Sequence, residues 1–346
     1  MTLPMNLSRV AFIGLAALAL GAASASAQPQ APAYRLAKTI PLGAPDRWDY
    51  VVFDPSGHRV YVAHSDRLTV VDPAAGKVVG EVQPVAGGTH GTGISAAAGQ
   101  GFTDDGRAGV AVAFDLKTLA IKTTIPAAPD ADGIVADRAS GRIFVVDGDS
   151  AKVSVIDPKT DKAVGSIDGG GKLEAAVSDD HGRLYVNGEE KREIVVMDTR
   201  SAKALAHWPM PMCESPHGIA VDFAGRRLFS TCANALMVVL NTQTGAVVTT
   251  LPIGHGSDSA AWDPVRKRAF SSNGEGTISV IQQKTPDSYV ALVPITTIRS
   301  ARTMAVDPVS GRLFVAGGDL DPASPAGTRP RLLPGSLRLM VFEPVG

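Results

Sequence analysis

The chain has 346 residues, of which 45% are hydrophobic and 19% are charged, and its formal net charge is −1. This length and composition are sufficient to bury a substantial core. The chain has no basic block that would neutralise phosphates, so its charge pattern gives no support to nucleic-acid binding.

The N-terminal 27 residues have the pattern of a secretory signal peptide. Arg9 precedes an apolar run over residues 10–20, and small residues follow up to Ala27. The run is too short to span a bilayer, and its A-x-A ending is typical of a cleavage site. We therefore predict cleavage after Ala27, a linker over residues 28–33, no membrane span and a periplasmic location, with secretion as the alternative.

Short strand-like runs follow from residue 34 onwards, separated by turns rich in glycine and proline. One sequence motif recurs among them: a turn, an arginine (Gln100 in the second copy) and, two residues later, an aromatic residue. Successive copies are 41 to 44 residues apart. The aromatic residues are Tyr61, Phe102, Phe144, Tyr185, Phe229, Phe270 and Phe314.

Each copy contains four strand-like runs, most clearly the fifth, with GIAVD, RLFSTC, ALMVVLN and AVVTTLPI. A period of about 40–45 residues with four strands is typical of a propeller blade. The seven copies therefore predict an all-β fold, a seven-bladed β-propeller forming one domain over residues 34–346. Because the last copy ends after its third run, we expect the first run, residues 34–42, to complete the seventh blade and cover its edge.

Three phrases at the aromatic positions, YVAH, YVNG and FSSN, resemble the YVTN repeat. With the segments GFTDDGR, LFSTC and FSSNGEGT, they make residues 34–346 similar to the YncE-type YVTN propellers of bacterial envelopes. The resemblance implies the propeller fold and an envelope location. It implies no particular reaction, since propellers host many unrelated functions.

An ionisable residue precedes the first run of every copy, at the predicted mouth of the central channel. We call this set the mouth ring. Its members are Asp49, His90, Asp132, Glu174, His217, Asp258 and Arg302. A wet channel mouth needs only polar residues, so a mainly acidic ring favours a site that attracts cations or cationic groups.

Binding is the function that we favour, by a monomer that engages a small ligand or an envelope protein at the mouth ring. A metal-dependent hydrolase of the lactonase type is one alternative, and an accessory protein of a metal-handling or redox system is another. His90, Glu174 and His217 are the candidate ligands for a divalent metal, because imidazole and carboxylate suit Zn, Mn or Fe. The chain has no nucleophile-elbow motif in the required context, so no catalytic residue is assigned, and without C-x-x-C-H no haem is expected.

The only two cysteines, Cys213 and Cys232, predict one disulfide in an exported protein. A proline-rich insertion, residues 319–335, interrupts the seventh copy and is expected to project from the mouth face as a binding or covering loop. Acidic residues in the loops of the same face are interpreted as a solvated surface, with an acidic docking face as the alternative. They are Asp66, Asp104, Asp105, Asp147, Asp149, Glu189, Glu190, Glu275, Asp319 and Asp321.

Overall fold

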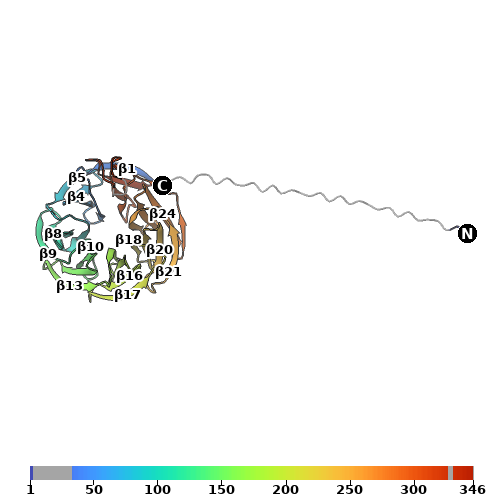
Figure 1. Cartoon of the computed structure of the whole chain (residues 1–346), viewed down its shortest axis with the longest axis horizontal. Helices are drawn as coiled ribbons and strands as arrows, with labels where there is room; N and C mark the ends of the chain where they lie inside the picture. The colour runs from blue at the N-terminus through green and yellow to red at the C-terminus, as the bar shows by residue number, and fades with distance from the viewer. Residues whose placement is uncertain (3–32, 326–329, 346) are drawn as a thin grey trace. The chain divides into compact units, whose positions relative to one another are not determined.

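The computed structural model describes residues 1–2, 33–325 and 330–345. The predicted signal peptide and most of the linker lie outside the described residues. From residue 33 onwards the chain forms seven antiparallel sheets that are arranged radially around a common axis (Figure 1). This confirms the seven-bladed β-propeller.

Each of the first three blades is formed by four consecutive strands. Blade one contains β2 (Val51–Asp54), β3 (Arg59–His64), β4 (Arg67–Asp72) and β5 (Lys77–Val82). Blade two contains β6 (Thr92–Ser95), the short 3-10 turn η1 (Ala96–Ala98), β7 (Gln100–Asp105), β8 (Val110–Asp115) and β9 (Ile121–Pro126). Blade three contains β10 (Ala131–Asp137), β11 (Arg142–Asp147), β12 (Lys152–Asp157) and β13 (Lys162–Asp168).

The next two blades repeat this order, and the sixth departs from it at its outer edge. Blade four contains β14 (Leu173–Ser178), β15 (Arg183–Gly188), β16 (Glu193–Asp198) and β17 (Lys203–Pro209). Blade five contains β18 (Pro216–Asp222), β19 (Arg227–Cys232), β20 (Leu236–Asn241) and β21 (Val247–Pro252). Blade six contains β22 (Ser257–Asp263), β23 (Arg268–Asn273), β24 (Thr277–Thr285), β25 (Ser288–Ala291) and β26 (Ile295–Thr296). Both β25 and β26 pair with β24, and Pro294 lies between them, where a residue without an N–H cannot continue the ladder.

The seventh blade joins the two ends of the propeller. Its strands are β27 (Thr303–Val306), β28 (Leu313–Gly317), β29 (Arg338–Pro344) and β1 (Tyr34–Pro41). β1 pairs antiparallel with β29, from Tyr34 opposite Pro344 to Pro41 opposite Arg338. The predicted closure of the ring by the N-terminal strand is confirmed.

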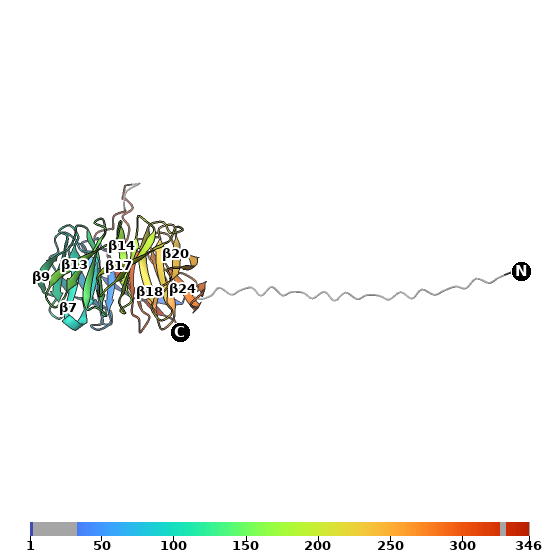
Figure 2. The ribbon, with the colours of Figure 1, turned by 90° about the horizontal axis from the view of Figure 1, so that it is seen from below.

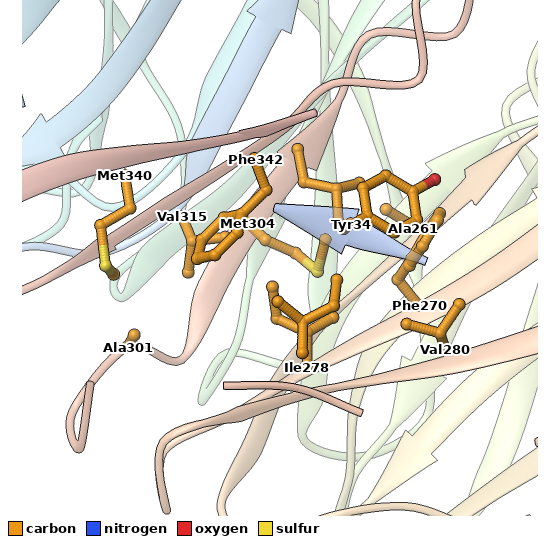
Figure 3. Close-up of a cluster of buried hydrophobic side chains, with 12 residues drawn as sticks. Tyr34, Ala261, Phe270, Ile278, Val280, Ala301, Met304, Val315, Met340 and Phe342 are labelled. Carbon is orange, nitrogen blue, oxygen red and sulfur yellow. The ribbon is translucent and has the colours of Figure 1, made fainter. Parts of the chain in front are cut away.

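The core lies between neighbouring blades. All seven repeat aromatic residues are at most 1% exposed. Figure 3 shows the cluster between blades six and seven, in which the ring of Tyr34 from β1 meets Phe270 edge to face, with centroids 5.6 Å apart. The N-terminal strand therefore closes the sheet and also packs its first side chain against the neighbouring blade.

Candidate functional site

The seven members of the mouth ring occupy one equivalent position in the seven blades. In each blade, the repeat aromatic residue pairs with a residue of the innermost strand, as Tyr61 pairs with Val52. The mouth-ring residue lies three positions before that partner in every blade. All seven side chains belong to residues that are half-buried. The register therefore places all seven residues at the start of the innermost strands, and ligand binding by them stays a prediction.

A cavity of about 150 Å³ runs along the propeller axis below these positions and is lined by residues of all seven innermost strands. The residues that follow six of the seven mouth-ring members line this cavity, and the residue at this position is small in six blades. The small residues are Gly91, Gly133, Ala175, Gly218, Ser259 and Thr303, of which Thr303 does not belong to the lining. The seventh is Tyr50, a residue that our sequence analysis did not single out, although one aromatic residue among six small ones is a readable signal.

Tyr50 reaches across the mouth from blade one to blade four. Its hydroxyl donates a hydrogen bond to Oε1 of Glu174 at 3.4 Å, and its ring packs against the apolar cluster between blades four and five. Burial, followed by the charges of Asp132, Asp258, Glu189 and Asp49, raises the pKa of Glu174 to about 9. Glu174 is therefore protonated at neutral pH, which fits its position among other carboxyl groups.

His90 is held by a buried carboxylate. Nδ1 of His90 is 2.7 Å from Oδ2 of Asp104, whose other oxygen accepts the backbone N–H groups of His90 and Gly91. Burial alone would lower the pKa of His90, but the hydrogen bond and charge of Asp104, with the charges of Asp132 and Asp49, raise it to about 9. His90 is accordingly an imidazolium at neutral pH, and it is 3.9 Å from Oδ1 of Asp132.

Two further carboxyl groups of the ring titrate near neutrality. Burial and the charge of Asp49 raise the pKa of Asp132 to about 7, against the opposing charge of His90. Burial raises the pKa of Asp49 to about 6, and the charge of Arg302 limits that rise. The mouth therefore contains carboxyl groups that lose or share protons in the physiological range, a feature that concentrates at functional sites.

Asp258 and Arg302 form an ion pair between blades six and seven. Nε of Arg302 is 2.9 Å from Oδ2 of Asp258, and its guanidinium lies over the ring of Trp48 at 5.3 Å. Nη2 of the same arginine donates to the carbonyl of Trp48 at 3.3 Å. The one cation that the sequence placed in the ring is thus already neutralised by a neighbouring ring member.

His217 stands apart from the paired members. Its Nδ1 is 2.6 Å from the carbonyl oxygen of Ser215, and its own carbonyl accepts a hydrogen bond from the side chain of Asn187. The loop that leads to it is fastened by the Cys213–Cys232 disulfide, in which the Cα atoms are 5.3 Å apart. The predicted disulfide is confirmed, and it joins the entry loop of blade five to the end of β19.

The metal candidates do not converge. Over the described ranges, no three His, Cys, Asp or Glu side chains are grouped closely enough to hold one ion. His90 is committed to Asp104, Glu174 to Tyr50 and His217 to a backbone carbonyl. These three residues therefore do not form a ready metal site, and a hydrolytic centre built on them stays an untested prediction.

The acidic loop residues are less free than a solvated surface implies. Asp104 and Asp147 are fully buried, which corrects that interpretation for both: Asp104 holds His90, and Asp147 accepts hydrogen bonds from the backbone and hydroxyl of Ser154. Several others are ion-paired with neighbouring cations, among them Asp66 with Arg67. Further such pairs are Glu189 with Lys172, Asp319 with Arg338 and Asp321 with Arg331.

The described parts of the blade-seven insertion project from the mouth face of the ring (Figure 2). Its two arms are joined by a β-bridge between Leu320 and Leu332. Oδ2 of Asp46 accepts the backbone N–H of Gly335 at 2.8 Å and so ties the insertion to the loop that enters blade one. The insertion is therefore a fixed wall beside the mouth ring at these residues.

No protein-family profile and no curated protein sequence matches the chain. Its structure resembles hydrazine synthase from Kuenenia stuttgartiensis with a TM-score of 0.68, 14% identity and coverage of 81% of this chain and 94% of that one. It also resembles the RRP9 WD40 repeats (TM-score 0.73, 11% identity, 90% and 100% covered). A chain of a mitotic checkpoint complex is similar as well (TM-score 0.72, 16% identity, 92% and 97% covered).

These likenesses show the propeller fold alone, because all three identities are low. Propellers are scaffolds on which binding surfaces of many kinds are built, so a role as a binding scaffold is compatible with the fold. The resemblance to the YVTN family stays a prediction. Among the described residues, no helix has the length and apolar character needed to cross a membrane.

Proposed function

We propose that the protein is an exported binding scaffold that takes a cationic group of a small ligand or of an envelope partner at the mouth ring. The observation that carries this proposal is that carboxyl groups from three other blades, those of Asp49, Asp132 and Asp258, lie near enough to Glu174 for their charges to raise its pKa. Within the ring, Asp258 is paired with Arg302, and Asp132 lies 3.9 Å from the imidazole of His90.

Burial and mutual repulsion support a cationic ligand over an anionic one. The pKa of Asp49 is raised to about 6, that of Asp132 to about 7 and that of Glu174 to about 9. Each raised pKa means that the ionised carboxylate is unfavourable in the empty mouth. An ammonium or guanidinium group that entered would favour the ionised forms and displace protons from these carboxyl groups.

Export is supported by the sequence and by the disulfide. The N-terminal 27 residues match a cleavable secretory signal, and disulfides persist in oxidising compartments such as the periplasm. The Cys213–Cys232 bridge closes the loop that carries His217. The similarity to YVTN propellers of bacterial envelopes points to the same compartment.

The proposal is tested by calorimetric titration with spermidine, a trication of small cross-section, at pH 7.5 in two buffers of different ionisation enthalpy. We expect saturable binding whose heat depends on the buffer, because protons leave the ring when the cation binds. The double variant Asp132→Asn, Glu174→Gln should lose the proton release and bind at least roughly tenfold more weakly.

Asp161→Asn is the matched control, because Asp161 lies in the turn between β12 and β13 at the opposite end of the blade. It should bind spermidine as the unchanged protein does. Equal affinity in the double variant and the unchanged protein, or the absence of any saturable binding, would overturn the proposed function.

A further inference from the structure

A second cavity, of about 660 Å³, lies beside the mouth ring on the same face. Its walls are the loop that enters blade one, the loops of blades six and seven and the two arms of the blade-seven insertion. This volume lies within the range of about 300–1,000 Å³ that is typical of small-molecule sites. The cavity is separate from the axial one, and Arg302 stands at its border with the ring.

The apolar part of this cavity is held in place by specific contacts. Trp48 is 8% exposed and lies under the guanidinium of Arg302. Leu320 and Leu332 face the cavity from the two arms of the insertion, which their β-bridge joins. The hydrogen bond from Gly335 to Asp46 fixes the insertion to blade one. The apolar wall is therefore preformed.

The polar part consists mainly of hydrogen-bond donors. Nε1 of Trp48 is buried and has no partner among the described residues. Arg47 is exposed, lines the cavity and takes part in no ion pair in the described part of the chain. Guanidinium and indole groups donate and do not accept, so the group that satisfies them is an acceptor, and a carboxylate suits both.

We propose that this cavity binds an amphipathic carboxylate, with the alkyl or aromatic body against Trp48, Leu320 and Leu332 and the carboxylate toward Arg47 and the indole N–H of Trp48. The inference goes beyond the proposed function. The site is different, the ligand has the opposite charge, and either proposal stands if the other fails.

Substitution of Asp46 tests the proposal, because it should change the affinity for a carboxylate in the direction opposite to substitution of Arg47. Asp46 is the one acidic side chain in the lining, its Oδ2 holds Gly335, and its Oδ1 has no partner among the described residues. An amide at this position keeps an oxygen for Gly335 and removes a charge that repels a bound carboxylate. Asp46→Asn should therefore strengthen binding, whereas Arg47→Gln should weaken it.

The experiment titrates the full-length mature protein with octanoate and with 1-octanol, which share an alkyl chain and differ in the charged head. We expect octanoate to bind at least tenfold more tightly than 1-octanol, a difference that corresponds to one charge-assisted contact. Arg47→Gln and Trp48→Phe should each weaken octanoate binding roughly threefold to tenfold, and Asp46→Asn should strengthen it roughly threefold.

Arg107→Gln is the control for loss of a cation on the same face, and Glu174→Gln is the control for the mouth ring. Both should leave the affinity for octanoate unchanged, and thermal melting of every variant verifies that it is folded. Equal affinities for octanoate and 1-octanol, or a shift of Asp46→Asn and Arg47→Gln in the same direction, would overturn the proposal. Loss of octanoate binding in Glu174→Gln would also overturn it, because the ligand would then sit in the ring.

Discussion

The hydroxyl of Tyr50 in blade one meets Oε1 of Glu174 in blade four at 3.4 Å, across the mouth of the propeller. Six of the seven blades place a small residue next to the mouth ring, and the seventh places this tyrosine. The single long side chain of Tyr50 thus occupies the centre of the propeller, where seven side chains of medium size would not fit together. The contact also links the apolar cluster of blades four and five to the loop that enters blade one.

Removal of the Tyr50 ring should destabilise the propeller more than removal of its hydroxyl. We expect Tyr50→Ala to lower the free energy of unfolding by roughly 1–3 kcal/mol. Removal of a fully buried ring would cost more, because such a ring makes more packing contacts than the half-buried ring of Tyr50. Tyr50→Phe should cost about 1 kcal/mol or less, the usual net value of one hydrogen bond. Urea denaturation measures both, and equal costs would show that the ring contributes nothing by packing.

The fold could be predicted from the sequence because every copy of the repeat has the same order of strands and turns. The aromatic residue of each copy pairs with the innermost strand three residues after the ring member, so counting back ten residues from the arginine position, and one fewer in blade four, placed all seven ring members. The Cys213–Cys232 bridge was likewise readable, since only two cysteines are present. These features depend on position along one blade.

Contacts between blades were not readable in this way. The burial of Asp104 under His90, a contact within blade two, was not readable either, because it depends on the direction of the Asp104 side chain at the end of β7. The contact of Trp48 with Arg302 and that of Tyr50 with Glu174 join residues more than 100 positions apart. Side-chain direction and the distance between blades decide such contacts, and no spacing in the sequence encodes either.

Close approach of the innermost strands predicts unequal effects of one substitution at equivalent glycines. A Cβ atom at Gly218 would lie 2.4 Å from a backbone atom of Ser259, and one at Gly91 would lie 2.5 Å from the backbone N of Ile134. We expect Gly91→Ala and Gly218→Ala each to cost roughly 1–3 kcal/mol, because two strands must move apart. Thermal or urea unfolding measures the difference.

Gly133 supplies the matched control at the same position in blade three. Its Cβ atom would be 3.5 Å from the nearest side-chain atom, an ordinary contact. Gly133→Ala should therefore change stability by less than about 1 kcal/mol, and a slight gain is expected because alanine is less flexible than glycine when unfolded. A cost at Gly133 equal to that at Gly218 would contradict the steric argument.

The buried carboxylate of Asp104 should control the charge state of His90. Asp104→Asn keeps an acceptor for the backbone N–H groups but removes the negative charge beside Nδ1. We expect the pKa of His90 to fall from about 9 by roughly 1–2 units, although Asp132 and Asp49 still raise it. Titration of the imidazole C–H signals by NMR measures the change.

Asp105→Asn is the control, because Asp105 is adjacent in the chain and accepts the backbone N–H of Gly87 instead. The pKa of His90 should be unchanged in that variant. An unchanged value in Asp104→Asn would mean that the other carboxylates of the mouth hold the proton on His90.

Glu174 should make the propeller less stable as the pH rises. Its pKa in the folded protein is about 9, above the value of about 4.5 for an unperturbed glutamate, so the unfolded chain releases the proton more readily. The penalty grows between pH 4.5 and pH 9 and is absent below that window. Glu174→Gln cannot ionise and should therefore match the unchanged protein near pH 4 and exceed its stability increasingly at higher pH, by up to about 5 kcal/mol at pH 8. The hydroxyl of Tyr50 and the carboxyl groups of Asp132, Asp258, Glu189 and Asp49 face the same group, and the uncharged amide leaves their mutual repulsion as it is beside a protonated Glu174. Urea denaturation from pH 4 to pH 9 measures the difference, with Glu190→Gln, in an exposed loop of the same face, as the control for changing a carboxyl to an amide. A stability difference that is constant across this range would rule out a buried, protonated Glu174.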